Sequence, residues 1–120
     1  MKRVAITGAG TINALGHDVA QTLTAFREGR CGITELAIQD LDRLGVRIGA
    51  QVHDWDPEAH FNRQQISLYD KFTQFTLLAA KEAIGQSGLD FEGRLGLDSG
   101  VVLGTAGGGV NTWDENYRAV

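Results

Sequence analysis

Glycine is the feature of this sequence that most restricts how the chain can fold. It accounts for 16 of the 120 residues, about 13%, where about 7% is usual, while proline occurs once. The glycines gather behind two apolar, β-branched runs, residues 3–7 and residues 100–104. Such runs are typical of buried strands, and the glycines that follow them are typical of tight loops. Because a helix-like stretch follows each loop, we predict an α/β fold with a parallel layer of strands.

Helix signals follow both loops. Asp18, with Gln21 three places on, forms a capping-box start for a helix that ends at Gly29. The final residues, 110–120, also have a helical pattern. Each apolar run is therefore predicted to lead through glycines into a helix.

The middle of the chain contains the longest predicted helix. Ser67 with Asp70 forms a capping-box start, and an apolar stripe continues from there to the glycines at 85–88. Asp56 followed by Pro57 indicates the start of a shorter helix or turn. Residues 47–52 have only a weak strand pattern, because a glycine interrupts them.

Composition excludes several classes of function. The net charge is -4 and the basic residues are scattered, so we expect no nucleic-acid partner. The longest apolar run is residues 77–80, far short of the ~20 residues that cross a bilayer, and we expect a cytoplasmic protein without a membrane span. The single cysteine cannot form an internal disulfide, and no Cys/His cluster has metal-site spacing, so no metal is expected.

The first glycine loop, residues 8–16, is a candidate nucleotide site. Glycines between a strand and a helix can cradle the pyrophosphate of a dinucleotide, which would make the protein an NAD(P)-dependent reductase. The spacing argues against this, because Asn13 stands where the dinucleotide fingerprint requires glycine. The favoured interpretation is a tight turn that packs the helix on the sheet, with no cofactor.

Other candidate residues have a structural interpretation. Cys31 lies in a polar, glycine-flanked stretch, and no histidine or acid lies at a spacing that would mark it as the base for a catalytic thiol. An inert thiol is therefore favoured over a nucleophile. The dispersed His17, His53 and His60 are expected to be solvated side chains. The two tryptophans, at positions 55 and 113, are expected to be half-buried packing anchors.

The second glycine loop, residues 104–109, leaves two interpretations open. Three successive glycines bare the backbone, so a ligand or a second protein chain can approach closely. The alternative is a flexible turn.

Five motifs in register carry a family resemblance. They are Arg3-Val4-x-Ile6-Thr7-Gly8-x-Gly10 followed by Gly16, Gly29-Arg30-Cys31-Gly32-Ile33, Asp70-Lys71-Phe72-Thr73-Gln74, Ala80-x-Glu82-Ala83-Ile84-x-x-Ser87-Gly88-Leu89, and Gly104-Thr105-x-Gly107-Gly108. In this order they resemble the N-terminal part of elongating β-ketoacyl-[acyl-carrier-protein] synthases.

The resemblance implies a thiolase-like fold, of which residues 1–120 are an incomplete N-terminal segment of the first half, and a homodimer. It implies an acyltransferase that condenses acyl and malonyl groups carried by acyl carrier protein, in fatty-acid or polyketide-type synthesis. The family's catalytic cysteine, histidines and lysine have no match in these residues, and Cys31 stands where relatives usually carry serine. We therefore expect no catalytic residue within this segment. A non-catalytic, chain-length-determining subunit of the same fold remains the alternative.

The resemblance assigns a substrate-binding role to Gly107 and Gly108. The loop at 104–109 matches a family segment at the dimer interface that reaches towards the partner's acyl pocket, and some relatives place a bulky aliphatic residue at the position of Gly107. Glycine there implies tolerance of longer acyl groups. Just before Asp70 the family commonly has several basic residues, whereas this chain has only Arg63. Weaker attraction of the acidic carrier protein follows, which makes a specialised carrier or pathway plausible.

Overall fold

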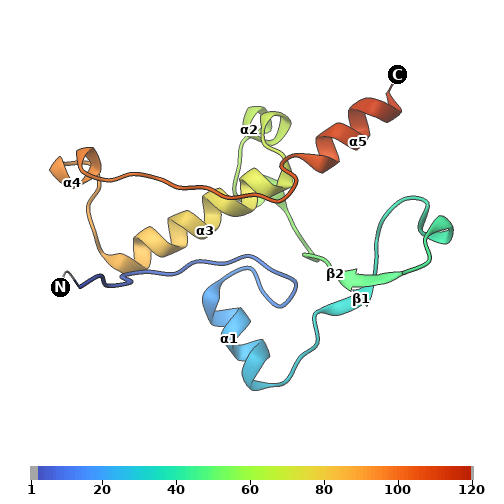
Figure 1. The fold of residues 1–120 in the computed structure, drawn as a ribbon, viewed down its shortest axis with the longest axis horizontal. Coiled ribbons are helices and arrows are strands. Elements are labelled where there is room, and N and C mark those ends of the chain that lie inside the picture. The colour runs from blue at the N-terminus through green and yellow to red at the C-terminus, as the bar shows by residue number, and fades with distance from the viewer. Residues whose placement is uncertain (1–2, 120) are drawn as a thin grey trace.

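A long central helix organises the structure, a computed structural model that describes residues 3–119 (Figure 1). The elements in chain order are α1 (Val19–Arg27), β1 (Ile33–Glu35), the 3-10 helix η1 (Leu41–Arg43), β2 (Ile48–Ala50), the 3-10 helix η2 (Pro57–Ala59), α2 (Arg63–Leu68), α3 (Lys71–Ser87), α4 (Arg94–Leu97) and α5 (Val110–Arg118). Helix α3 runs through the middle, and the first segment of the chain lies along it, where Gly8 and Gly10 approach Ala83 and Ala79 (Figure 1).

The predicted first helix is confirmed as α1. The Asp18 side chain accepts a hydrogen bond from the Gln21 amide at 2.6 Å, which satisfies one of the free N–H groups of the first turn. The Gln21 side chain in turn accepts from the His17 amide at 3.2 Å. Gly29, just beyond the helix, has a φ of 65°, a conformation that glycine adopts without strain.

The predicted helix start at Ser67 is wrong. Ser67 lies inside the short helix α2, where its hydroxyl donates to the Gln64 carbonyl instead of capping. Helix α2 begins after Asn62, and α3 begins after Asp70, whose side chain accepts from the Phe72 amide. A local capping pattern cannot show which of several polar residues takes the extended backbone of an N-cap. The end of the long helix is confirmed, since Gly88 is its C-cap with a φ of 64°.

Two shorter helices also agree with the sequence. Asp56 caps η2 by accepting from the Glu58 amide, and Pro57 occupies its first turn. The predicted C-terminal helix is α5 as far as Arg118, whereas the predicted position 120 lies outside the described residues. Helix α4 was not predicted.

The predicted parallel strands do not form among the residues that the structure describes. The runs 3–7 and 100–104 are extended without strand pairing, and the sheet consists of β1 and β2 in an antiparallel hairpin. Strand β2 lies within the weak run 47–52, while β1 was not predicted. A strand needs a neighbour that pairs with its N–H and C=O groups, and within residues 3–119 no ladder joins the two runs.

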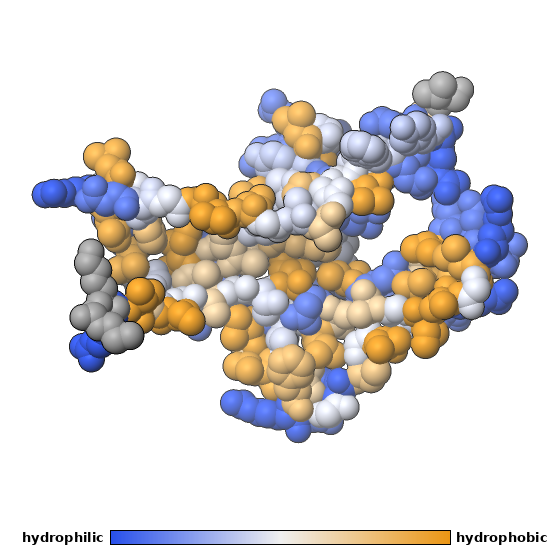
Figure 2. All heavy atoms as spheres, viewed as in Figure 1, coloured by the Kyte–Doolittle hydropathy of each residue, from blue (hydrophilic) through white to orange (hydrophobic). Residues whose placement is uncertain are grey.

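Much apolar surface stays exposed. The accessible surface is 9,893 Å², whereas a compact monomer of this mass exposes about 6,300 Å². Val4 is 95% and Val102 100% exposed, and Ala25 is the one buried hydrophobic residue of the described chain. Apolar residues cover much of the visible face (Figure 2). The two runs that were predicted to be buried strands are therefore exposed among the described residues, with no surface packed against them.

No helix among residues 3–119 is long and apolar enough to cross a membrane.

Candidate functional site

The glycine loop at residues 104–109 connects the second extended run to α5. The Thr105 hydroxyl accepts from the Gly108 amide at 3.0 Å, and the Gly108 carbonyl accepts from the Val110 amide at 3.0 Å. Gly108 has a φ of 61°, in the left-handed region that other L-residues enter only with strain. Gly108 is therefore required for the shape of this turn.

Gly107 differs from its neighbour in what it allows. Its φ is not positive, and a Cβ built on it would lie 3.0 Å from Cγ2 of Val110. That contact is tight, but its partner is the end of a side chain, which can move by a few tenths of an ångström. An added methyl group at position 107 therefore requires a small shift of Val110, whereas at Gly8 or Gly10 it would overlap a backbone carbonyl.

Asp70 anchors this loop from outside it. One carboxylate oxygen, Oδ2, accepts from the Thr112 amide at 3.0 Å and from the Thr112 hydroxyl at 2.7 Å. The other oxygen, Oδ1, accepts from the Phe72 amide at 3.3 Å in the first turn of α3. A single carboxylate thus joins the beginnings of α3 and α5. An open groove of about 560 Å³ between these helices is lined in part by Asp70, Lys71 and Thr112.

The electrostatics of Asp70 reflect these bonds. Burial by itself would raise the pKa of this carboxyl, but hydrogen bonds from the Thr112 hydroxyl and amide, followed by those from the Phe72 amide and the Asn111 side chain, outweigh it. The pKa of Asp70 consequently lies below its ordinary value. The carboxylate is ionised at neutral pH, in a position that also suits the positive ends of two helix dipoles.

The first glycine loop is bound tightly to α3. A Cβ on Gly8 would overlap the Ala83 carbonyl, and one on Gly10 would overlap the Ala79 carbonyl. The backbone can therefore touch the helix only because these residues are glycines. This agrees with the favoured interpretation of the loop as a packing turn, although the surface against which it packs is α3 and not a sheet.

Two amide groups of this loop, and one at the start of α1, donate to side chains of α3. Glu82 accepts from the Thr11 amide at 3.0 Å and from the Val19 amide, in the first turn of α1, at 2.8 Å. Gln86 accepts from the Ala9 amide at 2.6 Å. A pyrophosphate would have to displace the Glu82 carboxylate from the helix N-terminus. The geometry therefore weighs against the nucleotide interpretation.

The expected solvated histidines are in part wrong. The edge of the His17 ring faces Trp55 with centroids 5.9 Å apart, and the His60 ring stacks on the same indole at 5.4 Å. His17 Nε2 also donates to the His53 carbonyl at 2.8 Å, and the His53 ring lies 2.9 Å from the Thr34 hydroxyl. His17 lies 36 positions before His53 in the sequence, so no local pattern could have shown that they are in contact.

Trp55 confirms its predicted role as a half-buried anchor. Its indole N–H donates to Gln74 Oε1 at 2.9 Å, and Gln74, only 4% exposed, donates to the Tyr69 carbonyl at 2.8 Å. The indole thereby fixes the junction of α2 and α3 that precedes Asp70. Trp113 is 69% exposed on α5, which corrects the expectation that it is half-buried.

Cys31 is an exposed thiol whose sulfur lies 4.0 Å from the Ile33 carbonyl, and it begins no helix. In the part of the chain that the structure describes, no three His, Cys, Asp or Glu side chains converge as metal ligands.

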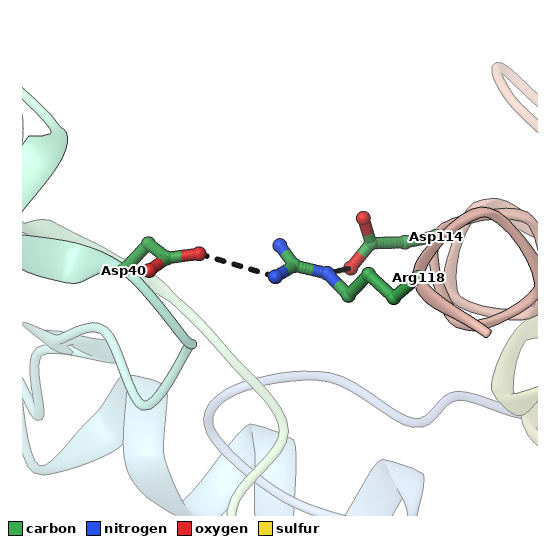
Figure 3. A network of polar contacts seen from close by, with 3 residues as sticks. All are labelled: Asp40, Asp114 and Arg118. Atoms are coloured by element: carbon green, nitrogen blue, oxygen red, sulfur yellow. Dashed lines mark hydrogen bonds and ion pairs between the residues drawn. The ribbon is translucent and has the colours of Figure 1, made fainter. Parts of the chain in front are cut away.

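An ion-pair network ties the end of α5 to the hairpin (Figure 3). The Arg118 guanidinium bonds Asp114 at 2.8 Å within the helix and Asp40 at 3.1 Å at the start of η1. These bonds raise the pKa of Arg118 further above its ordinary value. All three side chains are about half exposed, so we assign the network a modest part in stability.

Comparison with known proteins gives the class of the chain. The family model described as "Beta-ketoacyl synthase, N-terminal domain" matches residues 1–119. The chain belongs to the β-ketoacyl synthase family.

Its curated relatives include two kinds of protein. Nodulation protein E of Rhizobium sp. (strain N33) is 34% identical over 119 residues, which are 99% of this chain and 29% of that protein. The 3-oxoacyl-[acyl-carrier-protein] synthase 2 of Coxiella burnetii (strain RSA 493 / Nine Mile phase I) is 31% identical over 99% of this chain and 29% of its own length. The corresponding synthase of Staphylococcus aureus (strain N315) is 30% identical over 98% of this chain and 28% of its own length. The chain therefore spans less than a third of the length of these relatives.

Proposed function

We propose that this chain is the N-terminal segment of a β-ketoacyl-[acyl-carrier-protein] synthase with a thiolase-like fold. The observation that carries the proposal is the family match over residues 1–119, with synthases named for acyl carrier protein among the relatives. The apolar runs at 3–7 and 100–104 support the fold, because their exposed Val4 and Val102 suit strands that are covered in a larger assembly.

The proposed reaction is a decarboxylative condensation. An acyl group held as a thioester on an enzyme cysteine is attacked by the carbanion that malonyl-carrier protein yields on loss of CO₂. A carbon–carbon bond forms, the cysteine thiolate leaves, and the product is a β-ketoacyl thioester on the carrier. The reacting groups belong to polypeptide outside residues 1–120, and this segment supplies scaffold and part of the acyl pocket, without cofactor or metal.

Within this segment we assign the acyl pocket wall to Gly107 and Gly108. Gly108 maintains the turn through its positive φ, whereas Gly107 has a conformation that admits a side chain. Absence of a side chain at 107 leaves room for long acyl chains. Replacing Gly107→Ile in the full-length protein should shorten the longest chain accepted, and an unchanged chain-length preference would contradict the assignment.

The proposed partners are acyl carrier protein and a second copy of the protein in a homodimer. Few basic residues precede Asp70, since Arg63 is followed by uncharged side chains, so attraction of the acidic carrier should depend on other parts of the surface or on a specialised carrier. The similarity to a protein named for nodulation supports a specialised pathway.

The direct test is condensation by the full-length protein. Incubation with an acyl-carrier protein and malonyl-carrier protein should release CO₂ and give the β-ketoacyl product, detected by mass spectrometry. A protein that binds both carriers but forms no product alone would be the chain-length-determining subunit instead. Saturable binding of NADPH would point to the reductase and would overturn the proposal.

A further inference from the structure

We propose that Asp70 is a positioning residue that sets the acyl-chain selectivity of the glycine loop at 104–109. The inference rests on the proposed function, because it assumes that this loop forms part of the acyl pocket. Asp70 lies 34 positions before the loop, and the family resemblance assigns a substrate-binding role to Gly107 and Gly108 only.

The first observation is that the start of α5 has no cap of its own. Its N-cap residue is Gly109, which has no side chain with which to accept a hydrogen bond. The missing acceptor is Asp70, whose Oδ2 accepts hydrogen bonds from both the amide and the hydroxyl of Thr112 in the first turn of α5. Free N–H groups at a helix start need an acceptor, and here the acceptor belongs to another helix.

The second observation is that the same carboxylate is fixed at its other oxygen. Oδ1 accepts from the Phe72 amide, and the Asp70 carbonyl accepts from the amides of Thr73 and Gln74, so Asp70 is held as the N-cap of α3. The Asp70 carboxylate therefore holds the start of α5 against the start of α3, the central helix. The Asp70 side chain joins the two helix starts directly, independently of the chain segment that connects α3 to α5.

The third observation is the close approach of the loop to this carboxylate. A Cβ built on Gly109 would lie 3.2 Å from Asp70 Oδ2 and 3.5 Å from its Cγ. The loop therefore rests on the Asp70 side chain at Gly109, two residues from Gly107. A side chain at position 109 would press on the Asp70 carboxylate and should therefore disturb its bond to Thr112.

A movement of α5 would reach the proposed pocket position directly. Val110 opens α5, and its Cγ2 lies 3.0 Å from where a Cβ on Gly107 would be. When the bond between Asp70 and Thr112 is lost, the first turn of α5 can shift, and Val110 shifts with it. The room beside Gly107, and with it the preferred acyl length, should then change.

The test uses three variants of the full-length protein. Asp70→Asn retains the shape but leaves one acceptor oxygen for two helices, and Thr112→Val removes the hydroxyl alone. Thr112→Ser retains both bonds and is the matched control. The measured quantity is the ratio of kcat/KM for a long acyl chain to that for a short one, together with hydrogen exchange of the amides at 110–112.

We expect Asp70→Asn to change the ratio by about fivefold or more and to speed exchange of the Thr112 amide, with Thr112→Val intermediate and Thr112→Ser unchanged. An equal loss of kcat/KM for all chain lengths would show a merely structural role and would overturn the inference. If Asp70→Asn does not fold, Thr112→Val decides: a ratio equal to that of Thr112→Ser contradicts the inference.

Failure of the inference can be told from failure of the proposed function. If Gly107→Ile alters the chain-length ratio but Asp70→Asn and Thr112→Val do not, the pocket assignment stands and the role of Asp70 is refuted. If Gly107→Ile also leaves the ratio unchanged, the loop does not line the acyl pocket, and the pocket assignment and the role of Asp70 both fall; absence of condensation by the wild type is the separate result that overturns the proposed function.

Discussion

The two glycine-rich loops of this chain each follow an apolar run, but their structures differ. In residues 8–16, Gly8 and Gly10 allow the loop backbone to touch the backbone of α3, and the amides of Ala9 and Thr11 donate to side chains of that helix. In residues 104–109 a Cβ on Gly104 would meet nothing within 4 Å, and Gly108 has a positive φ. Glycine thus allows backbone-to-backbone packing in the first loop. In the second loop it shapes a turn whose neighbours are side chains, those of Val110 and Asp70. The comparison teaches that the surroundings of a glycine, more than its spacing, distinguish scaffold from candidate site.

The largest expected effect is on packing of the first loop. Gly10→Ala in the full-length protein would place a methyl group on the Ala79 carbonyl, where the backbone must move. We expect a loss of about 3 kcal/mol in the free energy of unfolding. Gly107→Ala, whose added methyl group would meet only the end of the Val110 side chain, is the comparison in the second loop and should cost about 1 kcal/mol or less. Equal effects in denaturant unfolding would remove the distinction between the loops.

A smaller effect should follow from changing the acceptor that holds the first loop. Glu82→Gln leaves one oxygen where two now accept from the Thr11 and Val19 amides, and it removes a charge from the start of α1. We expect a loss of about 2 kcal/mol, because hydrogen bonds to charged groups contribute about 1.5–3 kcal/mol. Unfolding of Glu92→Gln, at an exposed position, gives the baseline. A Glu82→Gln protein as stable as this control would show that the bonds from Glu82 to the Thr11 and Val19 amides are not needed for stability.

The smallest expected effect is the pH dependence of the second loop. The folded-state pKa of Asp70 is lowered, so its contribution is present above the unfolded pKa of about 3.9 and is lost as pH falls through the lower folded value. We expect the wild type to exceed Asp70→Asn in stability by about 1 kcal/mol at pH 6, as for loss of a helix cap. The difference should shrink steadily below about pH 4. A difference that grows on acidification would contradict the assigned role of the carboxylate.

Local chemistry made part of this structure predictable. The Asp18 cap, the turn at Gly29, the proline start of η2 and the end of α3 at Gly88 all depend on residues a few positions apart. The five motifs were likewise enough to identify the family, as the match over residues 1–119 shows.

The parts that sequence reasoning missed depend on distant contacts. Asp70 and Thr112 are 42 positions apart, and Glu82 lies 63 positions from Val19, so no periodicity links them. The two predicted strands that did not form also depend on distant contacts. Their apolar residues predicted burial, but Val4 is 95% and Val102 100% exposed, because a strand also requires a neighbour and pairing is a property of the assembled chain.

Whether the second glycine loop lines the acyl pocket is decided by the product distribution of the full-length protein in a competition assay. Wild type, Gly107→Ile and the control Gly45→Ile, a substitution into open space in the hairpin, each receive an equimolar series of acyl-carrier proteins with malonyl-carrier protein. Mass spectrometry should show β-ketoacyl products shifted to shorter chains for Gly107→Ile alone. The same distribution from all three proteins would contradict the assignment of the second glycine loop to the acyl pocket.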